Sequence, residues 1–217
     1  MTQNAIPRDR DDVASRVASR TVARREASYA GEVRRLLDAA LVVIERLGTT
    51  GRPRVADIVA EAGLSNDAFY RHFASKDALV AALLEDGAQR LASYLRHQTE
   101  KETSPRERVR RWVEGVLSQT EGDVARSTRA VLWNGGSVDS GPAAGRHFAS
   151  APLAELLAES LDALGSSTPA LDAALVTHAV LGRVADHLWQ ETHPGVEEVD
   201  HIVAFCLRTT AAPRRRR

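Results

Sequence analysis

The chain has 217 residues, of which 43% are hydrophobic and 27% are charged, the ordinary composition of a soluble globular protein. The 29 basic residues balance the 29 acidic ones, so the net charge does not by itself indicate nucleic-acid binding, although a basic footprint can be local. Cys206 is the only cysteine, which excludes an internal disulfide and a cysteine-based zinc cluster. No apolar run is long enough to cross a bilayer, and the N-terminus lacks the apolar core of a signal peptide. We therefore expect a cytoplasmic protein with no membrane partner.

The N-terminal segment mixes arginine and aspartate without a sustained apolar period, and we predict a disordered arm over residues 1–26. A first helix is expected from about Ala27 to Leu47, because its apolar side chains fall on one helical stripe. Those side chains are Val33, Leu36, Leu37, Ala40, Leu41 and Ile44. Gly48 follows at the position where glycine commonly ends a helix.

The next segment predicts two short helices joined by a tight turn. The first has an apolar face made by Val55, Ile58, Val59 and Ala62. Gly63 stands where the chain must turn, since glycine reaches positive φ without steric cost. Ser65 is a good N-cap for the second helix, because its hydroxyl can accept from free backbone N–H groups.

The second short helix is polar on one side. Ala68, Phe69 and Phe73 are expected to face inward. The outward positions carry Asn66, Asp67, Tyr70, Arg71 and His72. This pattern is typical of a helix-turn-helix, whose second helix has the size and chemistry to enter the DNA major groove.

Six further helices are expected after this motif, and no strand pattern or internal repeat is present. Ser75 caps a long helix that reaches about His97. Ser104 and Glu107 form a capping box, with proline at the first helical position of the next helix. The other four are expected at about 123–133, 154–164, 169–190 and from 196 onward. The fold class is therefore all-α.

The run GLSNDAFYRHFASKDAL resembles the signature of TetR-type bacterial transcriptional regulators. The matching positions are Gly63, Leu64, Ser65, Phe69, Tyr70, His72, Phe73, Ser75, Lys76, Asp77 and Leu79. The resemblance covers residues 27–84, and it departs from the family at Arg54, where a Ser or Thr cap is common. It implies a three-helix DNA-binding head at 27–75, joined to a larger helical ligand-binding and dimerisation body at 76–211. A basic tail follows at 212–217.

The resemblance assigns phosphate-clamping roles to Tyr70 and Lys76, contacts that position the head without reading sequence. Asn66 is expected to pair with adenine. Asp67 either accepts a hydrogen bond from the cytosine amino group or only stabilises the N-terminus of its own helix. Arg71 is expected at guanine or phosphate. The other DNA-contact candidates are Arg54 at a phosphate, Ser65, and His72 in a packed or phosphate-facing role. The arginines of the N-terminal segment form either a basic arm on DNA or a solvated tail: Arg16, Arg20, Arg24 and Arg25.

Two further surfaces are expected in the body. An apolar cavity for a small, mainly apolar effector would be lined by Trp112, Val116, Trp133, Phe148, His178 and Trp189, and plain core is the alternative for each. The resemblance implies that the last two helices pair with their copies in a second subunit. The expected interface residues are Leu181, Leu188, Val199, Ile202, Val203, Cys206 and Leu207, and burial within one subunit is the alternative.

The resemblance implies a homodimeric, ligand-responsive DNA-binding transcriptional regulator, a repressor that a small effector releases from a palindromic operator. An architectural DNA-binding protein without an effector is the alternative. An enzyme is disfavoured, because the segment from Gly136 to Asp139 lacks the flanking glycines of a nucleophile elbow. The chain also has no HExxH and no glycine-rich phosphate loop, and no cofactor or metal is expected.

Overall fold

The computed structural model describes the backbone of residues 9–135 and 142–208, and the side chains of residues 15–135 and 150–208. These residues form nine α-helices, one short 3-10 helix and no strand, which confirms the all-α prediction. The head contains α1 (Asp9–Leu47), α2 (Val55–Ala62) and α3 (Asn66–His72). The body contains α4 (Lys76–Thr99), α5 (Pro105–Leu117), η1 (Ser118–Thr120), α6 (Gly122–Asn134), α7 (Pro142–Ala163), α8 (Pro169–Gln190) and α9 (Val196–Arg208).

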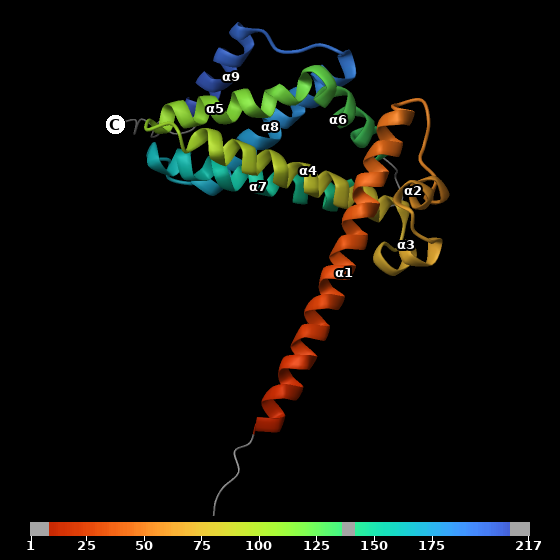
Figure 1. Ribbon diagram of the computed structural model, residues 1–217. Helices are drawn as coiled ribbons and strands as arrows, with labels where there is room; N and C mark the ends of the chain where they lie inside the picture. The colour runs from red at the N-terminus through yellow and green to blue at the C-terminus, as the bar shows by residue number, and fades with distance from the viewer. Residues whose placement is uncertain (1–8, 136–141, 209–217) are drawn as a thin grey trace, which may run out of the picture.

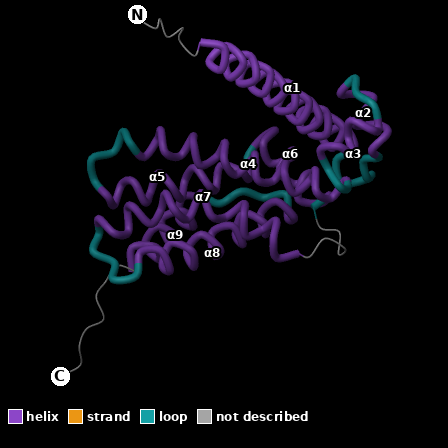
Figure 2. Tube along the Cα trace, turned by 90° about the horizontal axis from the view of Figure 1, so that it is seen from below, coloured by secondary structure: helices purple, strands orange, loops and turns teal. Residues whose placement is uncertain are grey.

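Helix α1 has two halves with different surroundings. Its C-terminal half packs beside α2 and α3, whereas its N-terminal half projects away from the rest of the molecule (Figure 1). Figure 2 shows the same separation between this half and the bundle of α4 to α9. Residues 9–26 are helical, which corrects the disordered arm expected there, whereas residues 1–8 of that arm lie outside the described residues. The projecting half lacks an apolar period because it packs on nothing, yet alanine and arginine are strong helix formers that extend a helix already nucleated by packing.

The core of the head is built from all three of its helices and from two helices of the body. Leu36, Ile44, Ile58 and Phe69 are fully buried in it. Helix α4 adds Val80 and Leu83 to the same cluster, and α6 adds Ala130 and Val131. The end of α6 lies close to α4, because a Cβ on Gly135 would meet Leu84 Cδ1 at 3.1 Å. The head is thus packed against the body through α4 and α6 together.

The core of the body is a separate apolar cluster that joins α5, α7, α8 and α9. Trp112 of α5 is fully buried in it, and its indole N–H donates to the carbonyl of Leu153 at 3.0 Å. The helices that begin at Pro105, Pro169 and Val196 start where the sequence predicts. Helix α7 runs from Pro142 to Ala163 and so extends before residues 154–164, where its sequence pattern is clearest.

Candidate nucleic-acid interface

The turn between α2 and α3 is fixed by Gly63 and by an arginine of α1. Gly63 has φ 61° and ψ 39°, in the left-handed region that favours glycine. Arg35 donates from Nη2 to the carbonyl oxygens of Ala62 at 2.6 Å and of Gly63 at 3.0 Å. These bonds satisfy carbonyl groups at the end of α2 and hold the turn against α1. No local pattern identifies Arg35, because its partners lie far along the chain.

Helix α3 is held at its N-terminus by the predicted cap and on its inner side by aromatic packing. The Ser65 hydroxyl accepts from the Ala68 N–H at 3.1 Å. Phe69 is fully buried, with its ring centroid 5.9 Å from that of Phe73. Because the inner side is fixed in this way, the polar side is held outward.

The exposed side of α3 carries the residues expected to contact DNA. Asn66 and Tyr70 are four residues apart, as are Asp67 and Arg71, so these pairs form two adjacent stripes. All four side chains are exposed, and Tyr70 is exposed to 59% despite its aromatic ring. An exposed tyrosine between polar groups is a surface that suits a phosphate backbone.

Three other predicted contacts lie at the edges of α3. Ser65 is exposed, although its hydroxyl is engaged in capping. Arg54 is exposed just before α2, and its backbone N–H donates to the Asp57 carboxylate at 3.4 Å. Lys76 is half-buried at the first position of α4, directly after Ser75, whose hydroxyl accepts from the Ala78 N–H at 3.1 Å.

His72 takes the packed role, one of the two expected for it, and its burial removes it from the candidate DNA contacts. Its side chain is 0% exposed, and Nε2 lies 2.7 Å from Glu32 Oε2. The ring meets Tyr29 edge-on at a centroid distance of 4.2 Å, and Nδ1 is buried without a hydrogen-bond partner. Arg71 reaches the same Glu32 carboxylate at 3.3 Å. The hydrogen bond with His72, together with the charge of Arg71, lowers the pKa of Glu32 below its ordinary value.

The five described residues among those expected to line an effector cavity are divided between the body core and the surface. Trp112 and Val116 are core residues, the alternative that the sequence left open. Trp133 and Trp189 form an exposed edge-to-face pair with centroids 6.0 Å apart. His178 is exposed, with Nδ1 2.7 Å from the Ala174 carbonyl oxygen. The side chain of Phe148 lies outside the described residues.

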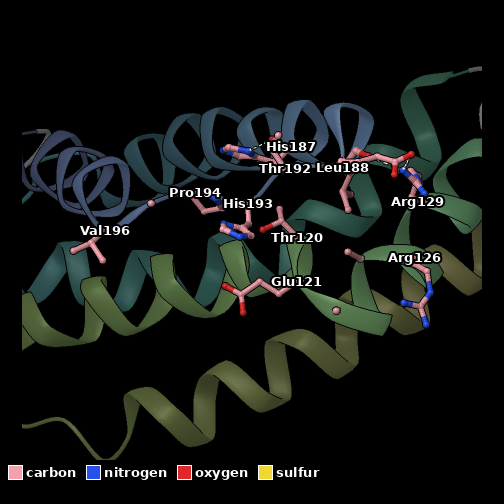
Figure 3. A pocket seen from close by; sticks show the side chains of 14 residues that line it. Thr120, Glu121, Arg126, Arg129, His187, Leu188, Thr192, His193, Pro194 and Val196 are labelled. Carbon is pink, nitrogen blue, oxygen red and sulfur yellow. Dashed lines mark hydrogen bonds and ion pairs between the residues drawn. The ribbon is translucent and has the colours of Figure 1, made fainter.

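A pocket of about 750 Å³ lies elsewhere in the body, between the start of α6, η1, the end of α8 and the loop from α8 to α9 (Figure 3). Its wall mixes apolar groups with charged ones, including Leu188, Arg126 and Arg129. The guanidinium of Arg129 lies 2.5 Å from the Glu191 carboxylate. At the back of the pocket, His187 Nδ1 lies 2.7 Å from the Thr192 hydroxyl.

The apolar stripe of α9 packs inside the subunit, so the expected interface residues need correction. Leu188, Ile202, Val203 and Cys206 are buried in the body core. The others are partly buried against it: Leu181, Val199 and Leu207. Burial raises the pKa of the Cys206 thiol to about 12.

The outward sides of α8 and of α9 each carry large apolar side chains that are exposed. Leu171 and Leu175 are one turn apart on α8 and are exposed to 59% and 62%. Trp189, near the end of α8, and Phe205 of α9 are also exposed. Sequence periodicity missed these side chains, because the inward stripe of each helix is the longer and more regular one.

Both the sequence of the head and the fold of the chain are similar to those of known proteins. Residues 36–83 match the family described as bacterial regulatory proteins, tetR family. The head therefore carries the DNA-binding domain of the tetR family. The matched segment contains the C-terminal part of α1, all of α2 and α3 and the start of α4, so the helix-turn-helix is a TetR-family DNA-binding domain.

Solved structures share the fold of this chain over most of its length. A putative TetR-family regulator from Mesorhizobium loti is 15% identical, with a TM-score of 0.61 over 84% of this chain and 96% of its own. RolR in complex with resorcinol is 17% identical, with a TM-score of 0.62 over 86% and 91%. FadR from Bacillus subtilis in complex with stearoyl-CoA is 14% identical, with a TM-score of 0.56 over 82% and 97%. No curated protein gives a significant match. Within the described ranges, no helix combines the length and apolar character needed to span a bilayer.

Proposed function

We propose that this TetR-family regulator is a repressor that binds a palindromic operator as a homodimer and leaves it when a small molecule binds the body. The observation that carries the proposal is the exposed polar side of α3, held outward by the Ser65 cap, the buried Phe69 and the Arg35 bonds to the turn. Such a helix has the dimensions to lie in a major groove.

The roles of individual residues follow from their positions on α3 and α4. Asn66, at the first position of α3, reads a base edge, since an amide pairs bidentately with adenine. Tyr70 and Lys76 bind backbone phosphates on the flank of the groove. Asp67 accepts from cytosine or acts only on the helix N-terminus, and Arg71 divides its charge between DNA and Glu32.

The exposed apolar side chains on the outward sides of α8 and α9 support dimerisation by these helices, with contact residues that differ from those expected from sequence. Leu171, Leu175, Trp189 and Phe205 are the large apolar side chains available there. Association surfaces often contain exposed apolar groups, and large aromatic side chains often carry most of the binding energy. A two-fold axis beside α8 and α9 gives two copies of α3, which would read half-sites about 34–36 Å apart, or a multiple of one turn.

The pocket at the start of α6 is the proposed effector site. Helix α6 supports this assignment, because one end of it lines the pocket and the other end is packed in the head. Ala125 and Arg129 are in the wall, whereas Ala130 and Val131 lie in the core of the head. The Ser127 hydroxyl also donates to the Glu45 carboxylate of α1. The charged groups of the wall favour an amphipathic effector over the mainly apolar one expected from sequence.

One experiment tests the proposal and its alternative together. Duplexes bound by the full-length protein are selected from random DNA, and metabolites are then screened for release of the selected duplex. We expect a palindromic consensus and at least one amphipathic compound that weakens binding. Linkage then requires the duplex to weaken binding of that compound by the same factor, typically about 5–150-fold. Selection of DNA without a consensus, and no releasing compound, would instead support an architectural DNA-binding protein.

A further inference from the structure

The projecting half of α1 is a straight continuation of a helix that contacts α3. The side chains of residues 15–31 are exposed, except for the half-buried Thr21. Where this half begins, Tyr29 lies against His72, and Glu32 binds both His72 and Arg71 at the end of α3. The direction of the projecting half is therefore set by its contacts with the recognition helix.

Two arginines of the projecting half lie on the side of α1 that faces the helix-turn-helix. Arg25 precedes Glu32 by seven residues, about two turns, so both side chains leave the helix on nearly the same side. Arg24 precedes Arg35 by eleven residues, about three turns, and Arg35 is bound to the turn before α3. At 1.5 Å per residue these separations are about 10 and 16 Å, comparable with the roughly 12 Å width of a major groove.

The part of this half that lies nearer to α3 has a charge that suits a polyanion. Residues 15–31 contain four arginines and one acidic residue, so their formal charge is 4 − 1 = +3. The first four residues of α1, at 9–12, add one arginine and three aspartates, so residues 9–31 together carry 5 − 4 = +1. Glu26 is the acidic residue, and it lies about 100° around the helix from Arg25 and on the side away from Arg24. The neutral balance of the whole chain conceals this local basic surface.

A second copy of the chain is a poorer occupant for the same helix. Pairing of helices requires apolar side chains at spacings of three and four residues. The exposed large apolar side chains of this half are Val17, Val22 and Tyr29. Val17 lies about 140° around the helix from Val22, so the three do not form one seam.

We infer that the projecting half of α1 is a second DNA-contact element, in which Arg20, Arg24 and Arg25 bind phosphates beside the groove occupied by α3. This inference rests on the proposal that α3 binds DNA. In the dimer, each projecting half (here also called the arm) extends the protected DNA from one half-site into the flanking base pairs. It adds affinity without adding sequence preference, since phosphate contacts carry no direct sequence information.

The test compares the full-length protein with a variant that carries Arg20→Ala, Arg24→Ala and Arg25→Ala. Alanine is the strongest helix former, so the arm stays helical, which circular dichroism checks. The matched control removes three exposed arginines of α4 and α5 by Arg90→Ala, Arg96→Ala and Arg106→Ala. The probe is a duplex selected from random DNA by the unaltered protein, made with and without about 10 flanking base pairs, roughly one helical turn, on each side.

We expect the arm variant to lose affinity for the flanked duplex, with a salt slope lower by about one unit for each lost phosphate contact. The control should behave as the unaltered protein, and replacing the same three arginines by lysine should restore most of the slope. Hydroxyl-radical protection of the flanks should disappear only in the arm variant. In the arm variant, a salt slope and a flank protection equal to those of the unaltered protein would overturn the inference. A molecular mass in solution without DNA that differs from that of the unaltered protein would also overturn it, because it would indicate that the projecting halves pair with each other. Failure of the unaltered protein to select any DNA would instead overturn the proposed function.

Discussion

The backbone of Gly63 determines how α3 is presented. We expect Gly63→Ala to destabilise the protein by about 1–2 kcal/mol, because a side chain at its left-handed φ is strained. The added Cβ would also lie 3.4 Å from Arg35 Nη2. Gly87, exposed within α4 with nothing near its Cβ position, is the matched control, and Gly87→Ala should stabilise by about 1 kcal/mol. Urea unfolding measures both changes, and a gain in stability for Gly63→Ala would contradict the turn geometry.

Asn66 and Lys76 differ in the kind of DNA contact proposed for them. Asn66→Ala should relax the preference at one base pair of each half-site by about 1–3 kcal/mol. Lys76→Ala should weaken binding to all DNA sequences by the same factor and lower the salt dependence of binding by about one unit of slope. Binding profiles over a library of operator variants separate the two results. A changed base preference in Lys76→Ala, or an unchanged one in Asn66→Ala, would count against these roles.

The Glu32 carboxylate connects α1 to α3, and its lowered pKa makes this connection depend on pH. A carboxyl group whose pKa falls on folding stabilises the protein above its unfolded value, here about 4.5, and loses that contribution as the pH falls through the folded value. The difference in unfolding free energy between the unaltered protein and Glu32→Gln should therefore be full above pH 4.5 and shrink below it. Thermal unfolding across pH tests this, with Glu26→Gln on the exposed half of α1 as the control. A difference that is constant from pH 3 to 7 would contradict it.

At the scale of the elements, α6 connects the pocket to the head. Ala125→Phe should fill part of the pocket and abolish release of DNA by an effector, while operator affinity stays near that of the unaltered protein. The reason is that Ala125 lies in the wall, away from the head residues Ala130 and Val131. Titration of an operator complex with the effector gives the answer, after thermal unfolding confirms that the variant is folded. Normal release from Ala125→Phe would place the effector elsewhere.

The sequence predicted the starts of those helices that begin with a proline or with a capping serine. Pro105 and Pro169 occupy the first positions of their helices, and the Ser65 and Ser75 caps form as expected. The Ser104 hydroxyl, however, makes no capping bond, so the box predicted there is incomplete. The start of α1 was not predicted, because a helix that packs on nothing has no apolar period to detect.

The candidate site was predictable only in part, and for a physical reason. Local pattern identifies which side of α3 is polar, and five of its residues were correctly placed on or beside that side: Ser65, Asn66, Asp67, Tyr70 and Arg71. It does not reveal that His72 is buried, because its partners Glu32 and Tyr29 come from a distant part of α1. An apolar stripe likewise predicts burial without saying whether the same subunit or a second one covers it, which is why the α9 residues were misplaced.

At the scale of the whole molecule, the exposed apolar side chains of α8 and α9 determine the proposed assembly. Leu175→Glu should weaken the homodimer by about 2 kcal/mol or more, because the proposed contact would bury a carboxylate without a partner. Val124→Glu is the matched control, since Val124 is an exposed apolar residue of α6, outside those two helices. Sedimentation at micromolar concentration measures both variants. A dimer of unchanged stability in Leu175→Glu, or a monomeric mass for the unaltered protein, would contradict the proposed dimer contact through α8 and α9.

The sharing of the head core between α1, α2, α3, α4 and α6 limits how freely heads and bodies can be recombined. Val131 comes from a segment far along the chain, yet it helps to cover the same cluster as Ile44 and Val80. A head grafted onto a foreign body at α4 would leave that cluster facing an unrelated α6, with either a cavity or a steric clash. During evolution, therefore, an exchange of DNA specificity between such proteins is favoured when α3 changes its exposed residues in place. Recombination of whole heads requires a compensating change in α6.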